Sequence, residues 1–409
     1  MVCIYLRHKL KHKMSNFLSE RINKVSESAT IQMAKKAREL AAEGHKVISL
    51  SLGEPDFGTA DHIKQAATRA MDEGFTFYSP VAGYADLREA ITSKLKKDNG
   101  LEYAADQIVV STGAKQSIAN LVMSLVNPGD EVIIPAPYWV SYSEIVKFVE
   151  GECVFIEAGV ENDFKITPEQ LEAAITPKTK LFMYSSPCNP TGSVYSRDEL
   201  AALAAVFERH PHVFIMSDEI YEYINFVGGH ESIAQFGNLK ERTAVINGCS
   251  KGYAMTGWRI GYLAAPKAIA QACDKIQGQV TSGTCSIAQK AAVDAIQAGP
   301  DAEMIEAFRK RRGLVYDLLS EINGLKLNLP EGAFYFFPDV SSFFGKQYKG
   351  ETIHNASDLS MLLLKEAHVA VVTGEAFGSS RCIRLSYATS EEVLTEAIGR
   401  IKTVLDQIG

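Results

Sequence analysis

Short apolar runs alternate with amphipathic stretches over the first two thirds of the chain. The runs predict strands at residues 47–50, 108–110, 131–134, 153–156, 181–184, 213–216, 243–246 and 260–264. The stretches between them have apolar residues at helical spacing and predict helices at 31–43, 63–72, 85–97, 115–126, 140–149, 168–174 and 197–208. Strands that alternate with helices are typical of a mostly parallel sheet covered on both faces, so the pattern predicts an α/β fold.

The pattern changes after Lys267. Helical spacing continues to about Glu321. Apolar runs then follow at 325–329, 333–337, 369–372 and 382–385, with a helix at 356–368 and a final helix from Glu391. This mixture predicts a smaller α+β domain, and 409 residues are enough for two domains.

Composition narrows the class of protein. Hydrophobic residues make up 46% of the chain and charged residues 22%, as in ordinary globular proteins. The net charge of −7, without a basic region, gives no sign of a nucleic-acid partner, and no apolar run is long enough to predict a membrane-spanning helix. The seven cysteines are scattered without a Cys-x-x-Cys pair, which indicates reduced thiols in a cytoplasmic protein.

The first thirteen residues differ from the rest. Arg7, Lys9, Lys11 and Lys13 follow only a short apolar run, whereas a secretory signal has its charges before a longer apolar core. We therefore expect residues 1–13 to be a disordered leader, with Met14 as a plausible true start.

Candidate chemistry concentrates between Ser217 and Gly261. Asp218 and Tyr221 directly follow the apolar run 213–216, and Lys251 lies just past the run 243–247. An acid at one strand end and a lysine past the next strand suit a site for pyridoxal 5′-phosphate. In such a site a lysine forms a Schiff base, a carboxylate pairs with the pyridinium nitrogen, and cations and amides hold the phosphate.

The segment Ser-Lys-Gly-Tyr-Ala-Met-Thr-Gly-Trp-Arg-Ile-Gly-Tyr at 250–262 resembles the Schiff-base segment of fold-type I, class I aminotransferases. Within these it is most similar to the bacterial aspartate aminotransferases, and the resemblance extends from about Ser15 to the C-terminus. It implies a pyridoxal-phosphate-dependent transferase fold of type I, with a large domain at 56–304 and a small domain made of 14–55 and 305–409. It also implies a homodimer.

The resemblance assigns roles around the cofactor ring. Lys251 would form the Schiff base and carry a proton between the substrate Cα and the cofactor C4′. Asp218 would pair with the pyridine nitrogen, although a lone carboxylate at a strand end can also cap a turn. Tyr221 and Asn189 would contact the 3′-oxygen, Asn189 sometimes also the substrate carboxylate, and Trp139 would stack on the ring.

The phosphate contacts follow from the same resemblance. The sequence at 108–115 predicts a strand, a turn of small residues and a helix start, where free amides and the helix dipole favour an anion. Many relatives have a serine where this chain has Gly248, so Ser250 is the expected hydroxyl contact. The implied phosphate ligands are Gly113, Ala114, Ser250, Arg259 and, from the other subunit, Tyr78.

The resemblance also assigns residues that would bind the substrate. Arg384 matches the arginine that holds the α-carboxylate through two parallel hydrogen bonds, and Gly53 matches a glycine whose backbone approaches that carboxylate. In the bacterial subgroup the second carboxylate is bound by a lysine, here Lys115, assisted by a hydroxyl from the N-terminal segment, here Thr30. Two plainer interpretations stay open, namely a structural salt bridge for Arg384 and a solvent-exposed position for Lys115.

These residues predict an aminotransferase that converts L-aspartate and 2-oxoglutarate into oxaloacetate and L-glutamate. One alternative is the same chemistry with prephenate, aromatic or alanine-type substrates. A more distant alternative is a non-catalytic regulator that binds pyridoxal phosphate. Such a regulator would have an attached DNA-binding domain, for which this chain has no spare basic region.

Overall fold

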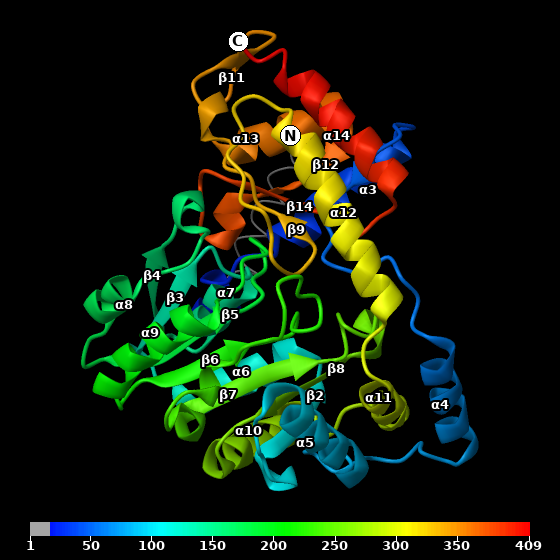
Figure 1. Cartoon of the computed structure of the whole chain (residues 1–409), viewed down its shortest axis with the longest axis vertical. Coiled ribbons are helices and arrows are strands. Elements are labelled where there is room, and N and C mark those ends of the chain that lie inside the picture. The colour runs from blue at the N-terminus through cyan, green and yellow to red at the C-terminus, as the bar shows by residue number, and fades with distance from the viewer. Residues whose placement is uncertain (1–16) are drawn as a thin grey trace.

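The computed structural model describes residues 17–409 (Figure 1). The predicted leader at 1–13 and the start at Met14 lie outside the described residues. Within 17–409, no helix combines the length and the apolar composition that crossing a membrane requires.

A seven-stranded sheet forms the centre of the larger part of the molecule, in the order β2-β8-β7-β6-β5-β3-β4. Its strands are β2 (Ile108–Thr112), β3 (Glu131–Ala136), β4 (Glu152–Glu157), β5 (Thr179–Ser185), β6 (Phe214–Asp218), β7 (Thr243–Gly248) and β8 (Ile260–Ala264). Within this sheet β8 alone is antiparallel to its neighbours β2 and β7. The predicted mostly parallel sheet is therefore confirmed, and each of its strands forms where an apolar run predicts it.

Helices cover both faces of this sheet, because successive residues of each strand point to opposite sides. Along β5, Leu181 and Met183 join the core beneath α6 (Ala114–Leu125), α7 (Ser141–Phe148) and α10 (Lys267–Val280). Phe182 and Tyr184 join the opposite core with α8 (Pro168–Ala174) and α9 (Arg197–Arg209). The packing of α4 (Asp61–Asp72), α5 (Ala85–Asn99) and α11 (Ser286–Ala298) forms a further core at the β2–β8 end.

The other elements form a second group around a separate core. The long helix α12 (Ala302–Ser320) extends from beside α11 into this group, as Figure 1 shows. The group contains α3 (Ala29–Ala42), α13 (Ala356–Leu362) and α14 (Glu391–Leu405), with the antiparallel sheet of β13 (Val372–Thr373), β14 (Ile383–Ser386) and β9 (Tyr335–Phe336). The short helix α2 (Glu20–Asn23) instead lies against α7 of the larger group. The hairpin of β10 (Gln347–Tyr348) and β11 (Glu351–Thr352) lies at its edge.

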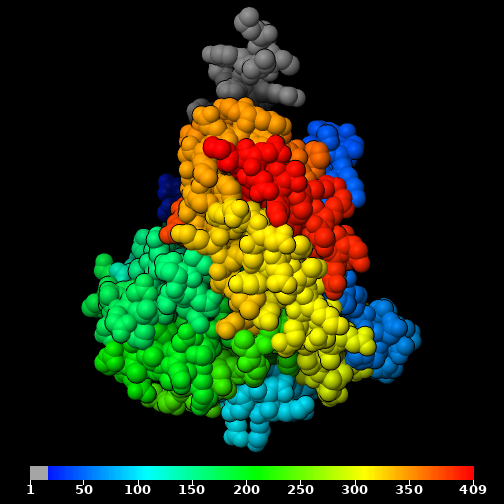
Figure 2. Space-filling view, turned by 45° about the horizontal axis from the view of Figure 1, so that its top comes forward, coloured from blue at the N-terminus to red at the C-terminus, as the bar shows by residue number. Residues whose placement is uncertain are grey.

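The segment that contains α3 and β1 joins this second group. The strand β1 (Ile48–Ser49) pairs in parallel with β12 (Val369–Ala370), so residues more than 300 positions apart in sequence become neighbours. In Figure 2 the red and orange C-terminal residues lie above the green and cyan residues of the sheet region. The active-site candidates come from both groups.

Three predicted segments differ from the structure. The run 369–372 is divided between β12 and β13, which belong to different sheets. The apolar run 325–329 forms only a single bridge, between Lys326 and Asp339. The helix predicted for 356–368 ends as α-helix at Leu362 and continues as a π-helical turn from Leu363 to Ala367. His368 then adopts a left-handed conformation with φ of 53°, which ends the helix before β12.

Candidate active site

A cavity of about 380 Å³ lies between the carboxyl end of β6, the start of α6 and the second group of elements. Parallel strands bring the residues that follow them to one edge of the sheet, which is where α/β proteins bind ligands. Twelve of the fourteen predicted site residues line this cavity: Thr30, Gly53, Ala114, Lys115, Trp139, Asn189, Asp218, Tyr221, Ser250, Lys251, Arg259 and Arg384.

Asp218 is the last residue of β6 and is buried in this cavity. Its Oδ2 accepts a hydrogen bond of 2.6 Å from the Tyr142 hydroxyl, and its Oδ1 accepts one of 3.2 Å from the Ile220 amide. Burial raises the pKa of Asp218 to about 6, against the opposing effect of these hydrogen bonds. Since no cationic side chain of residues 17–409 forms an ion pair with it, the carboxylate can receive a cationic ligand group.

Lys251 lies in the turn that follows β7, where the small residues Gly248 and Gly252 allow close packing of the backbone. Its Nζ donates a hydrogen bond to the Gly53 carbonyl oxygen. Burial lowers the pKa of Lys251 to about 8. About a tenth of such amines are neutral at pH 7, against fewer than about one in a thousand at the ordinary pKa of lysine. A neutral amine can act as a nucleophile or accept a proton.

An anion-binding arrangement lies at the first turn of α6. Gly113 precedes this helix with φ of 81°, and a Cβ there would collide with the Arg259 guanidinium. A Cβ on Gly261 would likewise collide with the backbone of Ala114, so both glycines are required by close approach. The amides at the helix start, the Arg259 guanidinium and the Ser250 hydroxyl are the donors that a phosphate needs.

Arg384 is buried on β14 among aromatic rings. Its guanidinium carbon lies 4.5 Å from the ring centre of Tyr335 and 4.8 Å from that of Phe377. Its Nη1 donates to Asn189 Oδ1 at 2.9 Å, and its Nη2 donates to the Ser51 carbonyl oxygen at 2.6 Å. Both partners are neutral, so the positive charge of Arg384 is not compensated by them.

The charge of Arg384 distinguishes it from its neighbour Arg381. Arg381 forms an ion pair with Asp339, whereas within 17–409 no acid pairs with Arg384, and its Nε has no hydrogen-bond partner. The alternative of a structural salt bridge for Arg384 is therefore wrong. A buried, uncompensated guanidinium is costly unless a ligand anion joins it, which favours a carboxylate-binding role.

Lys115 extends over a second side of the cavity. Its Nζ lies 4.9 Å from the ring centre of Trp139, a cation–π contact. Burial of the ammonium group and the nearby positive charge of Arg259 lower the pKa of Lys115. The residue as a whole is exposed, as the plainer interpretation expects, but its amine faces the cavity, with Thr30 on the same lining.

Two predicted residues are not on the cavity lining. Gly113 is buried behind the Arg259 guanidinium, as described above. Tyr78 is 98% exposed, and its neighbour Phe77 is 82% exposed. Its predicted contact involves a second subunit, so the exposure of Tyr78 in one chain does not test that role.

The sequence does not predict two tyrosines of the site, Tyr142 and Tyr335. Tyr142, whose hydroxyl donates to Asp218, lies in the first turn of α7, three positions after Trp139, and this closeness in sequence offers only a weak signal. Tyr335 lies 114 positions after Tyr221, yet their hydroxyls are 2.7 Å apart. The Tyr335 hydroxyl also fills the space that a side chain at Gly53 would need. Nothing in the sequence around Tyr335 indicates this contact.

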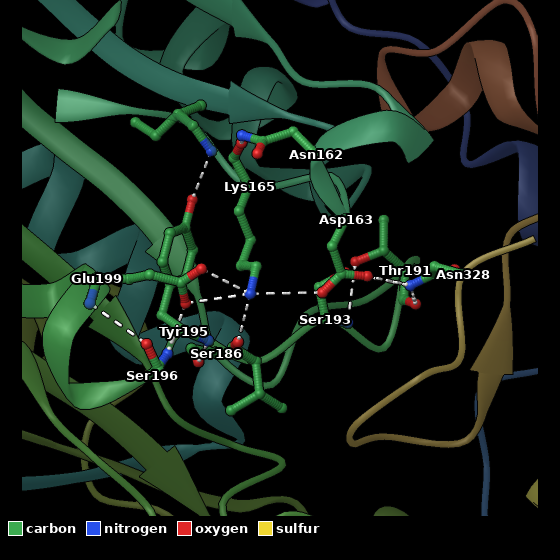
Figure 3. Close-up of polar contacts among 12 residues, drawn as sticks. Asn162, Asp163, Lys165, Ser186, Thr191, Ser193, Tyr195, Ser196, Glu199 and Asn328 are labelled. Carbon is green, nitrogen blue, oxygen red and sulfur yellow. Dashed lines mark hydrogen bonds and ion pairs between the residues drawn. The ribbon is translucent and has the colours of Figure 1, made fainter. Parts of the chain in front are cut away.

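Asn328 anchors the loop that follows Asn189, and Figure 3 shows Asn328 beside Thr191 and Asp163. Asn328 Nδ2 donates to the Thr191 carbonyl oxygen at 3.3 Å and to Asp163 Oδ1 at 2.8 Å. The ammonium of Lys165 in turn lies 3.5 Å from Asp163 Oδ2. This network holds the loop from which the Asn189 amide reaches Arg384.

Comparisons with known proteins show the family to which the chain belongs. Residues 45–401 match the family model described as aminotransferase class I and II. The chain is 51% identical over 392 residues to the aspartate/prephenate aminotransferase of Cereibacter sphaeroides, and the match covers 94% of this chain and 98% of that protein.

Solved structures are also similar. The aspartate aminotransferase from Rhizobium meliloti superposes with a TM-score of 0.93 at 44% identity, covering 96% of this chain and 99% of that one. The aspartate aminotransferase from Thermus thermophilus with maleate superposes with a TM-score of 0.88 at 40% identity, covering 95% and 99%.

Proposed function

The chain belongs to the aminotransferase class I and II family, and we propose that it transfers the amino group of L-aspartate to 2-oxoglutarate, giving oxaloacetate and L-glutamate. One observation carries the proposal: Arg384 and Lys115 line the same cavity, and neither forms an ion pair with an acid within residues 17–409. A substrate with two carboxylates can neutralise both. The name of the Cereibacter sphaeroides relative and the structure of the Thermus thermophilus enzyme with maleate, a dicarboxylate, support the same substrate class.

The enzyme depends on pyridoxal 5′-phosphate, as its family does, and the cavity residues fit this group. When bound, the cofactor supplies an aldehyde that condenses with amines and a ring that accepts electrons from the substrate Cα. The uncompensated Asp218 carboxylate would hold the ring nitrogen in its protonated form. The hydroxyl of Tyr221 and the amide of Asn189 would bind the 3′-oxygen, and Trp139 would cover the ring face.

Donors at the start of α6 would hold the phosphate. Ala114 presents a backbone amide there, next to Gly113, whose own amide donates to the Ser111 carbonyl oxygen at 2.8 Å. Ser250 and Arg259 add a hydroxyl and a guanidinium. Tyr78 of a second subunit would add another hydroxyl. Anchoring of the phosphate fixes the cofactor ring relative to Lys251.

Lys251 would move the proton. Because burial keeps its pKa near 8, a usable fraction of the amine is neutral at physiological pH. The neutral Nζ would take the proton from the substrate Cα and return it to C4′ of the cofactor. Arg384, assisted by Asn189 and the backbone near Gly53, would hold the α-carboxylate, and Lys115 with Thr30 would bind the distal one.

Prephenate is the second candidate amino acceptor. The relative from Cereibacter sphaeroides is named an aspartate/prephenate aminotransferase, and prephenate also has two carboxylates. The same pair of cations therefore suits it. A non-catalytic regulator is disfavoured, because relatives that are 51% and 48% identical over nearly the whole chain are named as enzymes.

The test of the proposed function uses half-reactions followed by cofactor absorbance with aspartate and alanine as donors. Lys115→Ala is expected to raise KM for aspartate about 10- to 100-fold, the range for a lost charge-assisted hydrogen bond, and to leave alanine unchanged. Lys115→Arg keeps the charge and serves as the control. Negligible aspartate turnover beside strong turnover of another donor would overturn the assignment.

Assembly, domain division and location extend the proposal. A homodimer is supported by the exposed side chains of Phe77 and Tyr78, which a partner subunit would cover.

The pairing of β1 with β12 supports a small domain of 14–55 and 305–409 beside a large domain of 56–304. Seven scattered cysteines without a Cys-x-x-Cys pair support a cytoplasmic enzyme. Analytical ultracentrifugation of wild type and Tyr78→Ala would test the dimer.

A further inference from the structure

A buried ion pair joins His230 to Glu219, the residue that follows Asp218 in sequence. The side chain of Glu219 is 1% exposed and that of His230 is 6% exposed, and His230 Nε2 lies 2.9 Å from Glu219 Oε2. The hydroxyls of Ser232 and Ser217 donate to Glu219 Oε1 at 2.6 Å and 2.8 Å. These two donors stabilise Glu219 in its ionised form.

A second buried pair adjoins the first. Lys94, on α5, forms an ion pair with Glu222, and their side chains are 4% and 3% exposed. Asn99 Nδ2 donates to Glu222 Oε2 at 2.9 Å and its Oδ1 accepts from Lys94 at 2.7 Å. The ligand atoms of Glu219, Glu222 and His230 lie within 4.8 Å of one another, a spacing that could suit a metal ion. Because the Lys94 ammonium already neutralises Glu222, the cluster is better described as two ion pairs.

The cluster shares one short segment with the cofactor residues. In residues 218–222, Asp218 and Tyr221 line the cavity, while Glu219 and Glu222 belong to the ion pairs. The Glu219 carboxylate is the neighbouring negative charge that destabilises an ionised Asp218. A cation that neutralises Glu219 therefore favours the ionised form of Asp218.

The directions of the pKa shifts agree with a protonated His230, whose Nδ1 has no hydrogen-bond partner within residues 17–409. Burial alone would lower the pKa of His230, but the carboxylates of Glu219 and Glu222 raise it above its ordinary value. Burial would raise the pKa of Glu219, but His230 and the two serine hydroxyls lower it. The other titratable and charged groups that face the pair are Glu222, Lys94, Asp218 and three phenols, those of Tyr103, Tyr184 and Tyr262.

We propose that His230 is a positioning residue whose buried imidazolium neutralises Glu219 and so keeps the Asp218 carboxylate ionised for the cofactor. This inference rests on the proposed role of Asp218. It goes further, because it assigns a function to a charge that neither substrate nor cofactor touches. A histidine that only fills space would not be coupled to the ionisation of Asp218.

The test measures the dissociation constant of pyridoxal 5′-phosphate from the dialysed apoenzyme between pH 6 and pH 9, as a ratio to wild type. The ratio removes the titration of the cofactor itself. If His230→Gln raises the pKa of Asp218 by about one unit, binding weakens about fivefold at pH 6 and is unchanged at pH 9. Glu219→Gln shifts the profile in the opposite direction, with binding about twofold tighter at pH 6. The double variant returns towards wild type.

His210→Gln is the matched control, since His210 Nε2 lies 2.7 Å from Glu172 in a partly exposed pair that does not line the cavity. Opposite shifts of the two single variants support the proposal. Shifts in the same direction, shifts equal to that of His210→Gln, or none would overturn it. If His230→Gln does not fold, Glu219→Gln alone still decides, because its predicted direction is opposite to that of general damage. Failure of wild type to bind the cofactor would instead refute the proposed function.

Discussion

Tyr142→Phe is expected to make cofactor binding strongly pH-dependent. The substitution removes the hydroxyl that donates to Asp218 Oδ2 at 2.6 Å and leaves the ring in place. A hydrogen bond to a charged group contributes about 2 kcal/mol, which corresponds to about 1.5 pKa units. The pKa of Asp218 in the apoenzyme should therefore rise from about 6 to about 7.5.

The direction of this pH dependence follows from the linkage between cofactor binding and the ionisation of Asp218. The protonated Asp218 cannot pair with a pyridinium. The affinity for pyridoxal 5′-phosphate is therefore highest above the pKa of Asp218 in the apoenzyme and decreases as the pH falls through that pKa. With the two pKa values above, the dissociation constant of the variant should exceed that of wild type about 16-fold at pH 6, about fourfold at pH 7 and negligibly at pH 9.

The assay titrates the apoenzyme with pyridoxal 5′-phosphate and follows the visible absorbance at each pH. Tyr103→Phe is the matched control, because Tyr103 is also buried but its hydroxyl has no hydrogen-bond partner in the described part of the chain. A variant-to-wild-type ratio that is constant from pH 6 to pH 9 would refute the reasoning. So would an equal effect of Tyr103→Phe.

Three further predictions concern single side chains. Arg384→Lys should raise KM for both amino and oxo acids about 30- to 150-fold through loss of bidentate binding, whereas Arg381→Lys should leave steady-state kinetics unchanged. Gly113→Ala should weaken cofactor binding at least about tenfold in the same titration, because its Cβ displaces the Arg259 guanidinium; unchanged affinity would contradict the anion site. Lys251→Ala should abolish turnover but keep the wild-type circular dichroism spectrum, and residual turnover above about a thousandth would exclude its proton-carrying role.

Much of the fold follows from local patterns. The apolar runs that predict β6 and β7 are buried strands because their residues pack on both faces of the sheet. The position of Asp218 at a strand end and of Lys251 past the next strand follows from the same runs. The run 325–329 does not form a strand: its backbone makes only the bridge between Lys326 and Asp339, while the Asn328 side chain anchors the loop that contains Asn189.

The sequence by itself determined the strands, the helices and the residue types of the site, because periodicity and motif spacing report the burial and chemistry of neighbouring residues. Only the tertiary structure decided which distant groups meet. Arg384 contacts Asn189 across 195 positions, and the Tyr221 and Tyr335 hydroxyls meet across 114. Whether a buried charge such as Arg384 is compensated depends on every element packed around it, and no local pattern contains that information.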